Sequence, residues 1–190
     1  MNVVKKILVE NLKLSNELFD RFMELSSTKY LKKKDFFTQA GKVCHHLGII
    51  ESGVLRSFIE KGPEEFTKDF YFPGSLAVSY GSFLTGEPCI GNIQALEETH
   101  LITLSRTAYF QLLEESVEWY KFVNYISFGF LVKKCPRESS FLTDDAYGRY
   151  KLLIKTYPRI EQFVSQHHIA SYLGIKPESL SRLKSLNKYQ

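Results

Sequence analysis

The spacing of apolar residues divides the chain into three parts. Residues 3–25 carry apolar side chains at helical intervals and predict an amphipathic helical segment, with a break near Ser15 left open. From about residue 30 to 105, short apolar runs alternate with glycine and proline turns, which predicts many short strands in an antiparallel roll or barrel. From Thr107 onward the helical spacing returns.

The third part opens with a long helix that is apolar on a broad arc. Four of its apolar residues follow a 4-3-4 spacing: Trp119, Val123, Ile126 and Phe130. A helix with so wide an apolar arc is buried on more than one side. We therefore predict a dimerisation helix over 116–135, with one side on the roll and the other on a second copy of the chain. The alternative is a helix wedged inside one domain.

Pro136 is expected to end this helix, because proline lacks the amide that a helix interior requires. The polar stretch that follows predicts a boundary. Either Asp144 or Asp145 can cap the next helix, and Pro158 stops it. The predicted domains are a roll with N-terminal helices over 1–115, the dimerisation helix over 116–135, and a C-terminal helical domain over 136–190.

The segment "QHHIASYLGIKPESLSRLKSL", residues 166–186, has the spacing of a helix-turn-helix. Ala170 lets two helices cross closely, and Gly174 suits a left-handed turn residue. Pro177 fits the first turn of the second helix. The remaining constraint is a set of inward apolar residues: Ile169, Leu173, Ile175, Leu180 and Leu183.

If those residues face inward, the second helix presents its polar residues to the major groove of DNA. Two of them suit base edges: Arg182 matches guanine and Glu178 matches a cytosine amino group. The rest of the predicted DNA-binding set comprises Ser179, Ser181 and Ser185 on the same face, and His167, Lys176 and Lys184 for phosphates. An ordinary helical hairpin with a polar face is the competing interpretation.

Charge supports a polyanionic partner at this end of the chain. The 190 residues carry a net charge of +4, but residues 151–190 hold seven Lys or Arg against two acids, which leaves the remainder near neutral. Such asymmetry suggests nucleic-acid binding, although a solvated basic surface explains it equally well. The three cysteines lie far apart without CxxC spacing, which argues against a disulfide framework or a zinc finger.

These motifs together resemble the Crp/Fnr transcription regulators. "IASYLGIKPESLSRL" resembles the DNA-binding motif of that family, and Glu178 and Arg182 fall at its base-reading positions. "LGIIESGVLRSFI", with Gly53 in its turn, and "FYFPGSLAV" resemble segments of its sensor roll. The resemblance implies an α+β fold: an N-terminal antiparallel β-roll of the cyclic-nucleotide-binding jelly-roll type, a long dimerisation helix and a C-terminal winged-helix-like head. Little chain follows the second helix, so we expect the wing to be missing.

The sequence departs from the family where a cyclic nucleotide would bind. The family uses a Gly-Glu pair for ribose and an Arg for the cyclic phosphate, whereas here Ser75 follows Gly74 and Pro88-Cys89 stands near the Arg position. Burying a phosphate without a cation is costly. We therefore expect an effector other than cAMP, or none. The candidate effector pocket comprises Phe72, Gly74, Ser75, Cys89 and Asn92.

The predicted function is a homodimeric, sequence-specific regulator that binds double-stranded DNA and is not an enzyme, with no catalytic residue, metal or cofactor. One alternative is a sensor module with a degenerate head that works through protein contacts. The other is a cupin-like metalloenzyme, supported only by His45, His46 and Glu51; adjacent histidines on a strand point to opposite faces and make poor joint ligands. The N-terminal residues lack a long apolar run, so we expect a cytoplasmic protein without a membrane segment.

Overall fold

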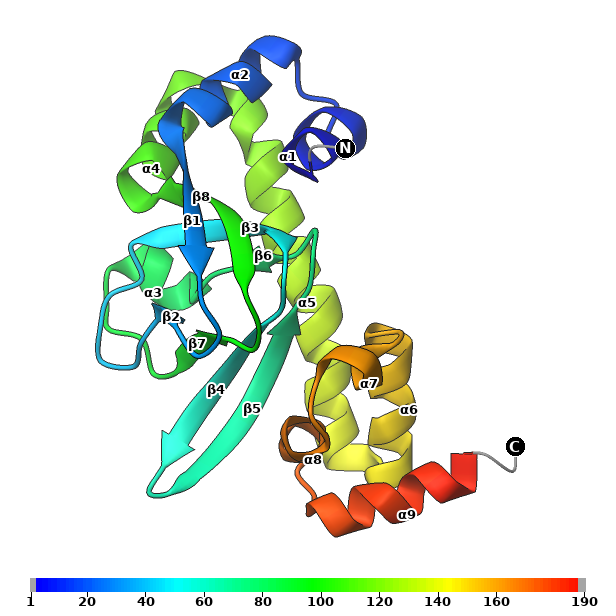
Figure 1. Ribbon diagram of the computed structural model, residues 1–190. Coiled ribbons are helices and arrows are strands. Elements are labelled where there is room, and N and C mark those ends of the chain that lie inside the picture. Colours follow the sequence, from blue (N-terminus) through cyan, green and yellow to red (C-terminus); the bar gives the residue numbers. More distant parts are fainter. Residues whose placement is uncertain (1–2, 188–190) are drawn as a thin grey trace. The chain divides into compact units, whose positions relative to one another are not determined.

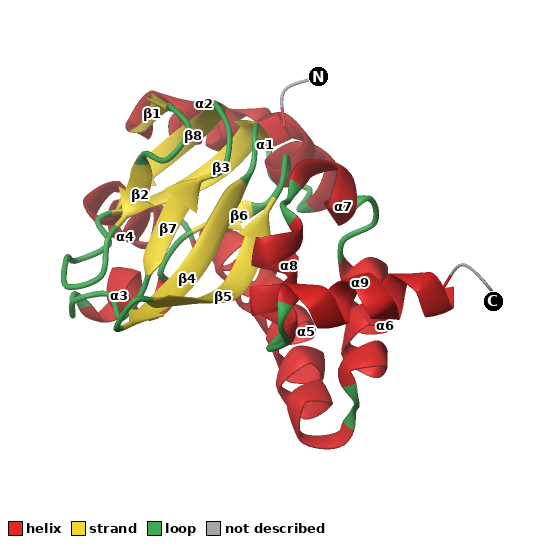
Figure 2. Cartoon of the chain, turned by 60° about the horizontal axis from the view of Figure 1, so that its bottom comes forward, coloured by secondary structure: helices red, strands yellow, loops and turns green. Residues whose placement is uncertain are grey.

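The computed structural model describes residues 3–187, with side chains described as far as residue 184. Its secondary structure is mixed, with strands confined to residues 26–105 (Figures 1 and 2). In chain order the elements are α1 Val3–Lys5, η1 Lys6–Asn11, α2 Asn16–Leu25, β1 Ser26–Leu31, β2 Phe36–Thr38, β3 His46–Ser52, β4 Leu55–Lys61, β5 Glu64–Tyr71, β6 Leu76–Ala77, α3 Tyr80–Thr85, β7 Asn92–Ala95, β8 Thr99–Ser105, α4 Arg106–Glu115, η2 Val117–Trp119, α5 Tyr120–Thr143, α6 Ala146–Thr156, α7 Ile160–Phe163, α8 Gln166–Leu173 and α9 Pro177–Asn187.

The strands form two four-stranded sheets, ordered β1-β8-β3-β6 and β2-β7-β4-β5. Every pairing given by register is antiparallel, for example Ile49 with Ile102 and Leu55 with Ala95. A cluster of buried residues fills the space between the sheets and draws on both: Leu31, Phe37, Ile50, Leu55, Tyr71, Ala77, Ile93, Ala95 and Leu101. The α+β fold with an antiparallel roll, predicted from the alternating runs, is confirmed.

Local sequence signals explain how the strands begin and end. β3 is buried through Leu47, Gly48, Ile49 and Ile50, because one face meets the core and α1 packs against the strand. The turn into β4 requires Gly53, whose φ is +92°. A Cβ at that position would lie 2.4 Å from the backbone oxygen of Glu98, so both the backbone angle and the space favour glycine.

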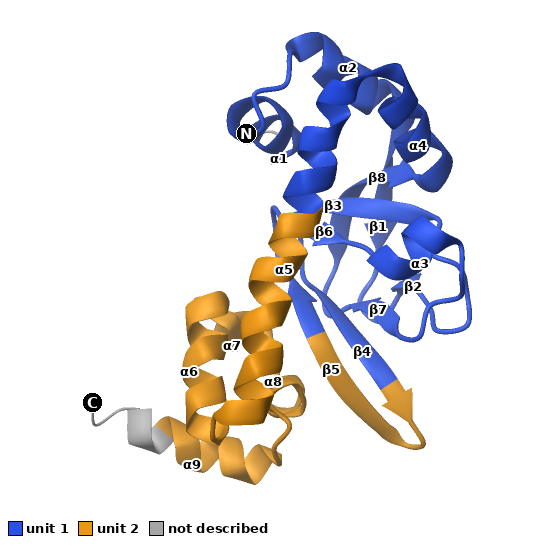
Figure 3. Ribbon diagram, turned by 180° about the vertical axis from the view of Figure 1, so that it is seen from behind, with its two compact units in different colours: residues 1–59, 69–126 blue, residues 60–68, 127–190 orange. Residues whose placement is uncertain are grey.

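The contacts group the residues into two units, drawn separately in Figure 3. The first comprises residues 1–59 and 69–126, which hold the roll and its helices. The second comprises residues 60–68 and 127–190, which hold α6 to α9, the second part of α5 and the tip of the β4–β5 hairpin. We call the second unit the head.

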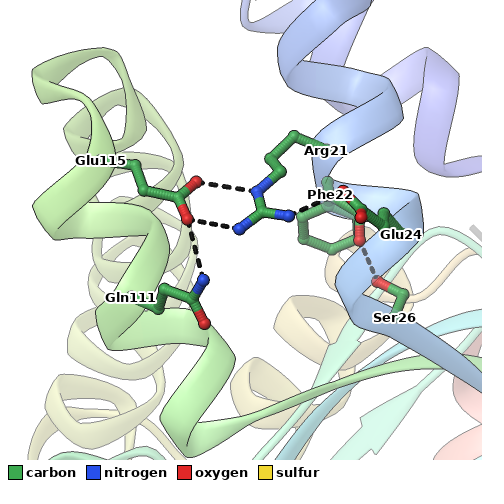
Figure 4. A network of polar contacts seen from close by, with 6 residues as sticks. All are labelled: Arg21, Phe22, Glu24, Ser26, Gln111 and Glu115. Carbon is green, nitrogen blue, oxygen red and sulfur yellow. Dashed lines mark hydrogen bonds and ion pairs between the residues drawn. The ribbon is translucent and has the colours of Figure 1, made fainter.

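An ion-pair network joins α2 to α4 within the first unit (Figure 4). The Arg21 guanidinium contacts both carboxylate oxygens of Glu115, at 2.9 and 2.5 Å, and Glu24 at 2.7 Å. Gln111 donates a further hydrogen bond to Glu115. Hydrogen bonds from Arg21 and Gln111 together lower the pKa of Glu115 to about 2.

The N-terminal break predicted near Ser15 is confirmed. η1 ends at Asn11, and the Ser15 side chain caps α2 by accepting a hydrogen bond from the Leu18 amide at 3.3 Å. The later cap falls on Asp145 rather than Asp144, since the Asp145 carboxylate accepts from the Gly148 amide at 2.8 Å.

The expected helix end at Pro136 is wrong. α5 continues from Tyr120 to Thr143 with Pro136 inside it. Proline removes one helical hydrogen bond, to the carbonyl four residues earlier. Here that carbonyl belongs to Val132, a residue on the exposed side of α5. The separate domain boundaries predicted at 115 and 135 remain predictions.

Candidate functional site

The two helices α8 and α9 meet at a tight turn, as the spacing predicts. Ser165 caps α8 by accepting from the His168 amide at 3.3 Å. Gly174 adopts the left-handed conformation, with φ +67° and ψ 36°, and Pro177 opens α9. The Ile175 amide donates to the Ala170 carbonyl at 3.1 Å and closes the turn.

The inward set is largely buried. Ile169, Ala170, Leu173 and Leu180 are all 0–1% exposed, whereas Ile175 and Leu183 are half-buried. The two helices therefore pack through the residues that the spacing selects. The polar residues of α9 are left facing outward.

Six of the eight predicted DNA-binding residues are exposed: His167, Lys176, Glu178, Ser179, Ser181 and Arg182. The side chain of Ser185 lies outside the described residues. The exposed set spans the start of α8, the turn and the first turns of α9. One continuous stretch of chain thus presents a cation, a carboxylate and hydroxyls together.

Lys184 is half-buried and forms an ion pair within the head. Its ammonium lies 2.6 Å from Glu161, and both side chains are partly buried. The Tyr150 hydroxyl contacts the same carboxylate at 3.0 Å. Burial and then this carboxylate raise the pKa of Tyr150 to about 12. In the free protein the charge of Lys184 is thus paired to Glu161, and its expected phosphate role stays a prediction.

Two arginines that the sequence reasoning missed hold the end of α8. Arg137 donates to the Tyr172 carbonyl at 3.1 Å, and Arg149 donates to the Leu173 carbonyl at 3.1 Å. Cations at a helix C-terminus satisfy its last carbonyls and complement its dipole. The ring of Phe141 lies near both guanidinium groups, at 4.8 and 4.9 Å from its centroid.

The hairpin tip within the head contacts α8 through Ser171. The Ser171 hydroxyl accepts from the Thr67 amide at 2.9 Å and donates to the Glu65 carbonyl at 2.7 Å. Arg137 also reaches the Thr67 carbonyl at 3.3 Å. Serine at this position carried no signal in the sequence, because its partners lie more than a hundred residues earlier.

The candidate effector residues fall into two groups in the first unit. Phe72, Gly74 and Ser75 form a turn against β3, where the Gly74 amide donates to the Ile50 carbonyl at 2.9 Å. Gly74 has φ +88°, which explains the glycine of "FPGS". Inside the turn the Ser75 hydroxyl accepts from the Phe72 amide at 3.2 Å, so that hydroxyl has a structural partner.

Cys89 and Asn92 make up the second group, beside the end of β2. The Asn92 side chain accepts from the Ala40 amide at 2.9 Å, and the Cys89 sulfur lies 3.4 Å from the Thr38 hydroxyl. Both residues are buried. The part of the roll expected to hold a phosphate cation therefore presents a thiol, an amide and a hydroxyl.

Two basic residues outside residues 74–96 contact other groups of the first unit. Arg56 is 1% exposed and lies 4.0 Å above the ring of Phe58. Leu55 belongs to the core between the sheets, so its neighbour Arg56 points to the opposite face of β4. Lys121 forms an ion pair with Glu118 on the same helical turn.

The expected dimer contacts need correction at two positions. Trp119 and Ile126 are 1% and 3% exposed, so the chain itself buries them. Trp119 packs on Phe22 of α2, with ring centroids 6.1 Å apart. Val123 and Phe130 are half-buried. Sequence periodicity identified a buried stripe but not which partner covers it.

A different set of apolar residues on α5 is exposed: Phe128 (70%), Leu131 (60%), Val132 (56%), Phe141 (42%) and Leu142 (84%). Residues 128, 131, 135 and 142 share one helical face, at 3-4-7 spacing. An apolar face of this kind on a monomer marks an interaction surface. We call Phe128, Leu131 and Leu142 the α5 seam.

The structure offers no support for a metalloenzyme. Within residues 3–187 no three His, Cys, Asp or Glu side chains are grouped so that they could hold a metal ion. His45 and His46 are exposed neighbours at the start of β3. No helix in that same range has both the length and the hydropathy needed to cross a membrane.

Comparison with known proteins assigns the roll. Residues 28–116 match the cyclic nucleotide-binding domain. The match covers β1 to α4, which is the roll and the helix that follows it. No curated protein sequence matches the chain.

Three solved structures share the fold. A double mutant of CooA from Carboxydothermus hydrogenoformans is 16% identical with TM-score 0.71, covering 100% of this chain and 85% of that one. FixK2 from Bradyrhizobium japonicum is 16% identical with TM-score 0.74, covering 87% and 85%. A protein from Eubacterium rectale assigned to the crp/fnr family of transcriptional regulators is 17% identical with TM-score 0.72, covering 95% and 86%. The likeness extends over the head as well as the roll.

Proposed function

We propose that the chain is a homodimeric, sequence-specific DNA-binding transcription regulator of the Crp/Fnr type. The observation that carries this proposal is the exposed polar face of α9, held on a buried apolar face and a left-handed glycine turn. Fold likeness to a crp/fnr regulator over most of the chain supports it. In such a head the second helix enters the major groove.

Roles follow from residue chemistry and exposure. Arg182 suits bidentate bonding to guanine, and Glu178 suits acceptance from a cytosine amino group. Lys176 and His167 are the exposed residues suited to phosphates, since Lys184 is paired to Glu161. Arg137 and Arg149 position α8 by holding its C-terminal carbonyls, rather than touching DNA.

The α5 seam is the proposed dimer contact. Its residues are apolar, exposed and in register on one helical face, the arrangement that pairs two helices in a coiled-coil manner. A two-fold dimer presents two copies of α9 to DNA and therefore predicts a near-palindromic operator. Replacing Phe128 by Asp puts a charge into this seam, so we expect monomers that bind DNA weakly.

The effector of the roll is proposed to be something other than a cyclic nucleotide, or absent. Residues 74–96 contain no Arg or Lys, and Glu87 adds a negative charge. Two cations outside this segment have other neighbours. Arg56 lies over the ring of Phe58, and Lys121 forms an ion pair with Glu118. A cyclic phosphate therefore has no identified cation to replace its water.

Selection from a random pool of double-stranded DNA tests the proposal. The wild-type protein is expected to enrich one near-palindromic motif, and Arg182→Ala is expected to relax one base position in each half-site. Ser139→Ala, a change at another exposed position of the head, serves as the matched control. Failure to enrich any motif, with the dimer intact in sedimentation, would favour the alternative of a sensor module that acts through protein contacts.

A further inference from the structure

Cys44 and Cys89 lie on two segments of the roll that pair with each other, although the two residues are 45 positions apart in sequence. Val43 and Pro88 form an isolated antiparallel bridge, and the Cys89 amide donates to the Lys42 carbonyl at 2.8 Å. Cys44 and Cys89 each follow a bridged residue and are 2% and 4% exposed. Residues 39–44 and 86–91 are thus held together at the backbone with both thiols beneath the surface.

Hydroxyl groups surround these thiols. The Thr38 hydroxyl lies 3.4 Å from the Cys89 sulfur, and the Ser82 hydroxyl accepts from the Cys44 amide at 3.0 Å. Thr38 and Ser79 each interact with both sulfurs, Ser79 through its backbone to Cys44 and its hydroxyl to Cys89. Two sulfurs that share two neighbouring residues lie within a few side-chain lengths of each other.

The surroundings make the two thiols unequal. Burial raises the pKa of Cys44, which favours its neutral thiol. Burial also acts to raise the pKa of Cys89, but hydrogen bonds from Ser79, Ser82 and Thr38 and from the Cys44 amide outweigh it and lower that pKa. The thiolate is the nucleophilic form of cysteine, so Cys89 is the attacking member and Cys44 the protonated neighbour.

We propose that Cys89 and Cys44 form a dithiol site that reacts with hydroperoxides, with Cys89 as the attacking sulfur and Cys44 as the resolving one. This site is independent of DNA binding by the head. It stands near the position where the sequence lacks the cation expected for a cyclic phosphate.

The reaction balances in two steps. The Cys89 thiolate attacks one oxygen of the hydroperoxide, the O–O bond breaks, and the leaving oxygen takes a proton and departs as water or an alcohol; Cys89 becomes a sulfenic acid. The Cys44 sulfur then attacks the Cys89 sulfur, the S–O bond breaks, and the proton of the Cys44 thiol joins the departing hydroxyl group, which leaves as water. The dithiol loses two hydrogens to become a disulfide while the hydroperoxide is reduced.

Closing the disulfide requires a small movement of the backbone. Diagonal partners across an antiparallel pair lie roughly 7–8 Å apart at Cα. A disulfide usually spans at most about 6.8 Å. Residues 39–44 and 86–91 must therefore approach each other by about 1 Å on oxidation. Ser82 contacts both the Cys44 amide and the Glu87 carbonyl, so α3 is tied to both segments that move.

Peptide mapping after oxidation tests the proposal on the full chain. The reduced protein is treated with hydrogen peroxide in slight excess, alkylated and digested without reductant. We expect a Cys44–Cys89 linked peptide that has lost two hydrogens, formed equally in Cys135→Ser protein. Cys135 is exposed in the single chain and lies on the helical face of the α5 seam, so Cys135→Ser also removes any cross-link between two copies. Oxidation of Cys135 with Cys44 and Cys89 left as free thiols would overturn the proposal.

Single variants assign the two roles. In Cys44→Ser protein, dimedone is expected to trap a sulfenic acid on Cys89; in Cys89→Ser protein it is expected to trap none on Cys44. Thr38→Val is expected to slow the oxidation of Cys89 several-fold, because it removes one hydroxyl from that sulfur. Circular dichroism confirms that each variant is folded. Trapping on Cys44 first, or an unchanged rate in the folded Thr38→Val protein, would show that the roles are wrongly assigned.

Discussion

Residues 74–96 of the roll and helix α9 of the head differ in the charge that they present. Residues 74–96 carry one acid, Glu87, and no Arg or Lys. From residue 176 to 184 the chain carries Lys176, Arg182 and Lys184 against Glu178. Both segments resemble phosphate-contacting parts of one family, yet only the second has cations. We therefore expect the roll to share the backbone of that family without sharing its ligand.

The two units also differ in what surrounds their turn glycines. Gly53 in the roll has φ +92°, and a Cβ added there would lie 2.4 Å from the backbone oxygen of Glu98. Gly174 in the head has φ +67°, and a Cβ added there would lie 3.1 Å from the ring of Phe141. The roll thus builds its turn against a rigid neighbour, whereas the head builds its turn against a side chain that can shift.

The largest expected effect concerns cyclic nucleotides. Losing the cationic partner of a buried anion costs about 3–5 kcal/mol, which is two to four powers of ten in affinity. Titration calorimetry with cAMP and cGMP is expected to give no saturable binding in the micromolar range. Micromolar binding of either nucleotide would contradict this expectation. It would show that a cation from elsewhere in the chain reaches residues 74–96.

A pair of glycine variants sharpens the second contrast. Gly174→Ala is expected to lower the free energy of unfolding by roughly 1–2 kcal/mol, because a left-handed residue with a Cβ is strained by that amount. Gly53→Ala adds a backbone overlap to the same strain and is expected to exceed about 2 kcal/mol. Chemical denaturation measures both. Equal losses would mean that the roll relaxes around Gly53 as readily as the head does around Gly174.

Within the head, substitutions of Arg182 and of Lys184 are expected to have different effects on DNA binding. Arg182→Ala should weaken specific binding by about 1–3 kcal/mol and leave non-specific binding less affected. Lys184→Ala should change the salt dependence less than Lys176→Ala does, because Lys184 is paired to Glu161. Mobility shifts over a range of salt concentrations measure both. A larger salt effect from Lys184 than from Lys176 would mean that DNA breaks the pair with Glu161.

The smallest effect concerns the ion pair of the roll unit. Arg21 holds the pKa of Glu115 at about 2, below its ordinary value, so the pair stabilises the folded state above pH of roughly 4.3 and is lost as pH falls toward 2. Glu115→Gln is expected to give a shallower fall in melting temperature across that window than wild type. Glu114→Gln, its exposed neighbour, should keep the wild-type slope.

The head could be predicted from sequence because its constraints are local. Gly174, Pro177 and the buried Leu180 lie within one short segment, and each is selected by backbone geometry or helical spacing. The roll was predictable as a class, since alternating runs and turn glycines mark strands. Its pairing order was not, because neighbouring strands such as β1 and β8 lie more than sixty residues apart.

The missed and corrected residues share a physical reason. Pro136 signals a helix end locally, but α5 passes through it and continues to Thr143. Trp119 and Ile126 have the right periodicity for a dimer stripe, yet α2 and the roll unit cover them first. Periodicity identifies which side chains are buried without identifying what buries them.

The sequence by itself determined the helical and strand periods, the turn glycines, the reader motif and the lack of cations in residues 74–96. All of these depend on backbone conformation and composition over a few residues. Only the tertiary structure decided which distant groups meet: Lys184 with Glu161, Ser171 with the hairpin tip, and Val43 with Pro88. Such pairs depend on how the strands and helices are connected in space, and side chains that are tens of residues apart leave no pattern in the local sequence.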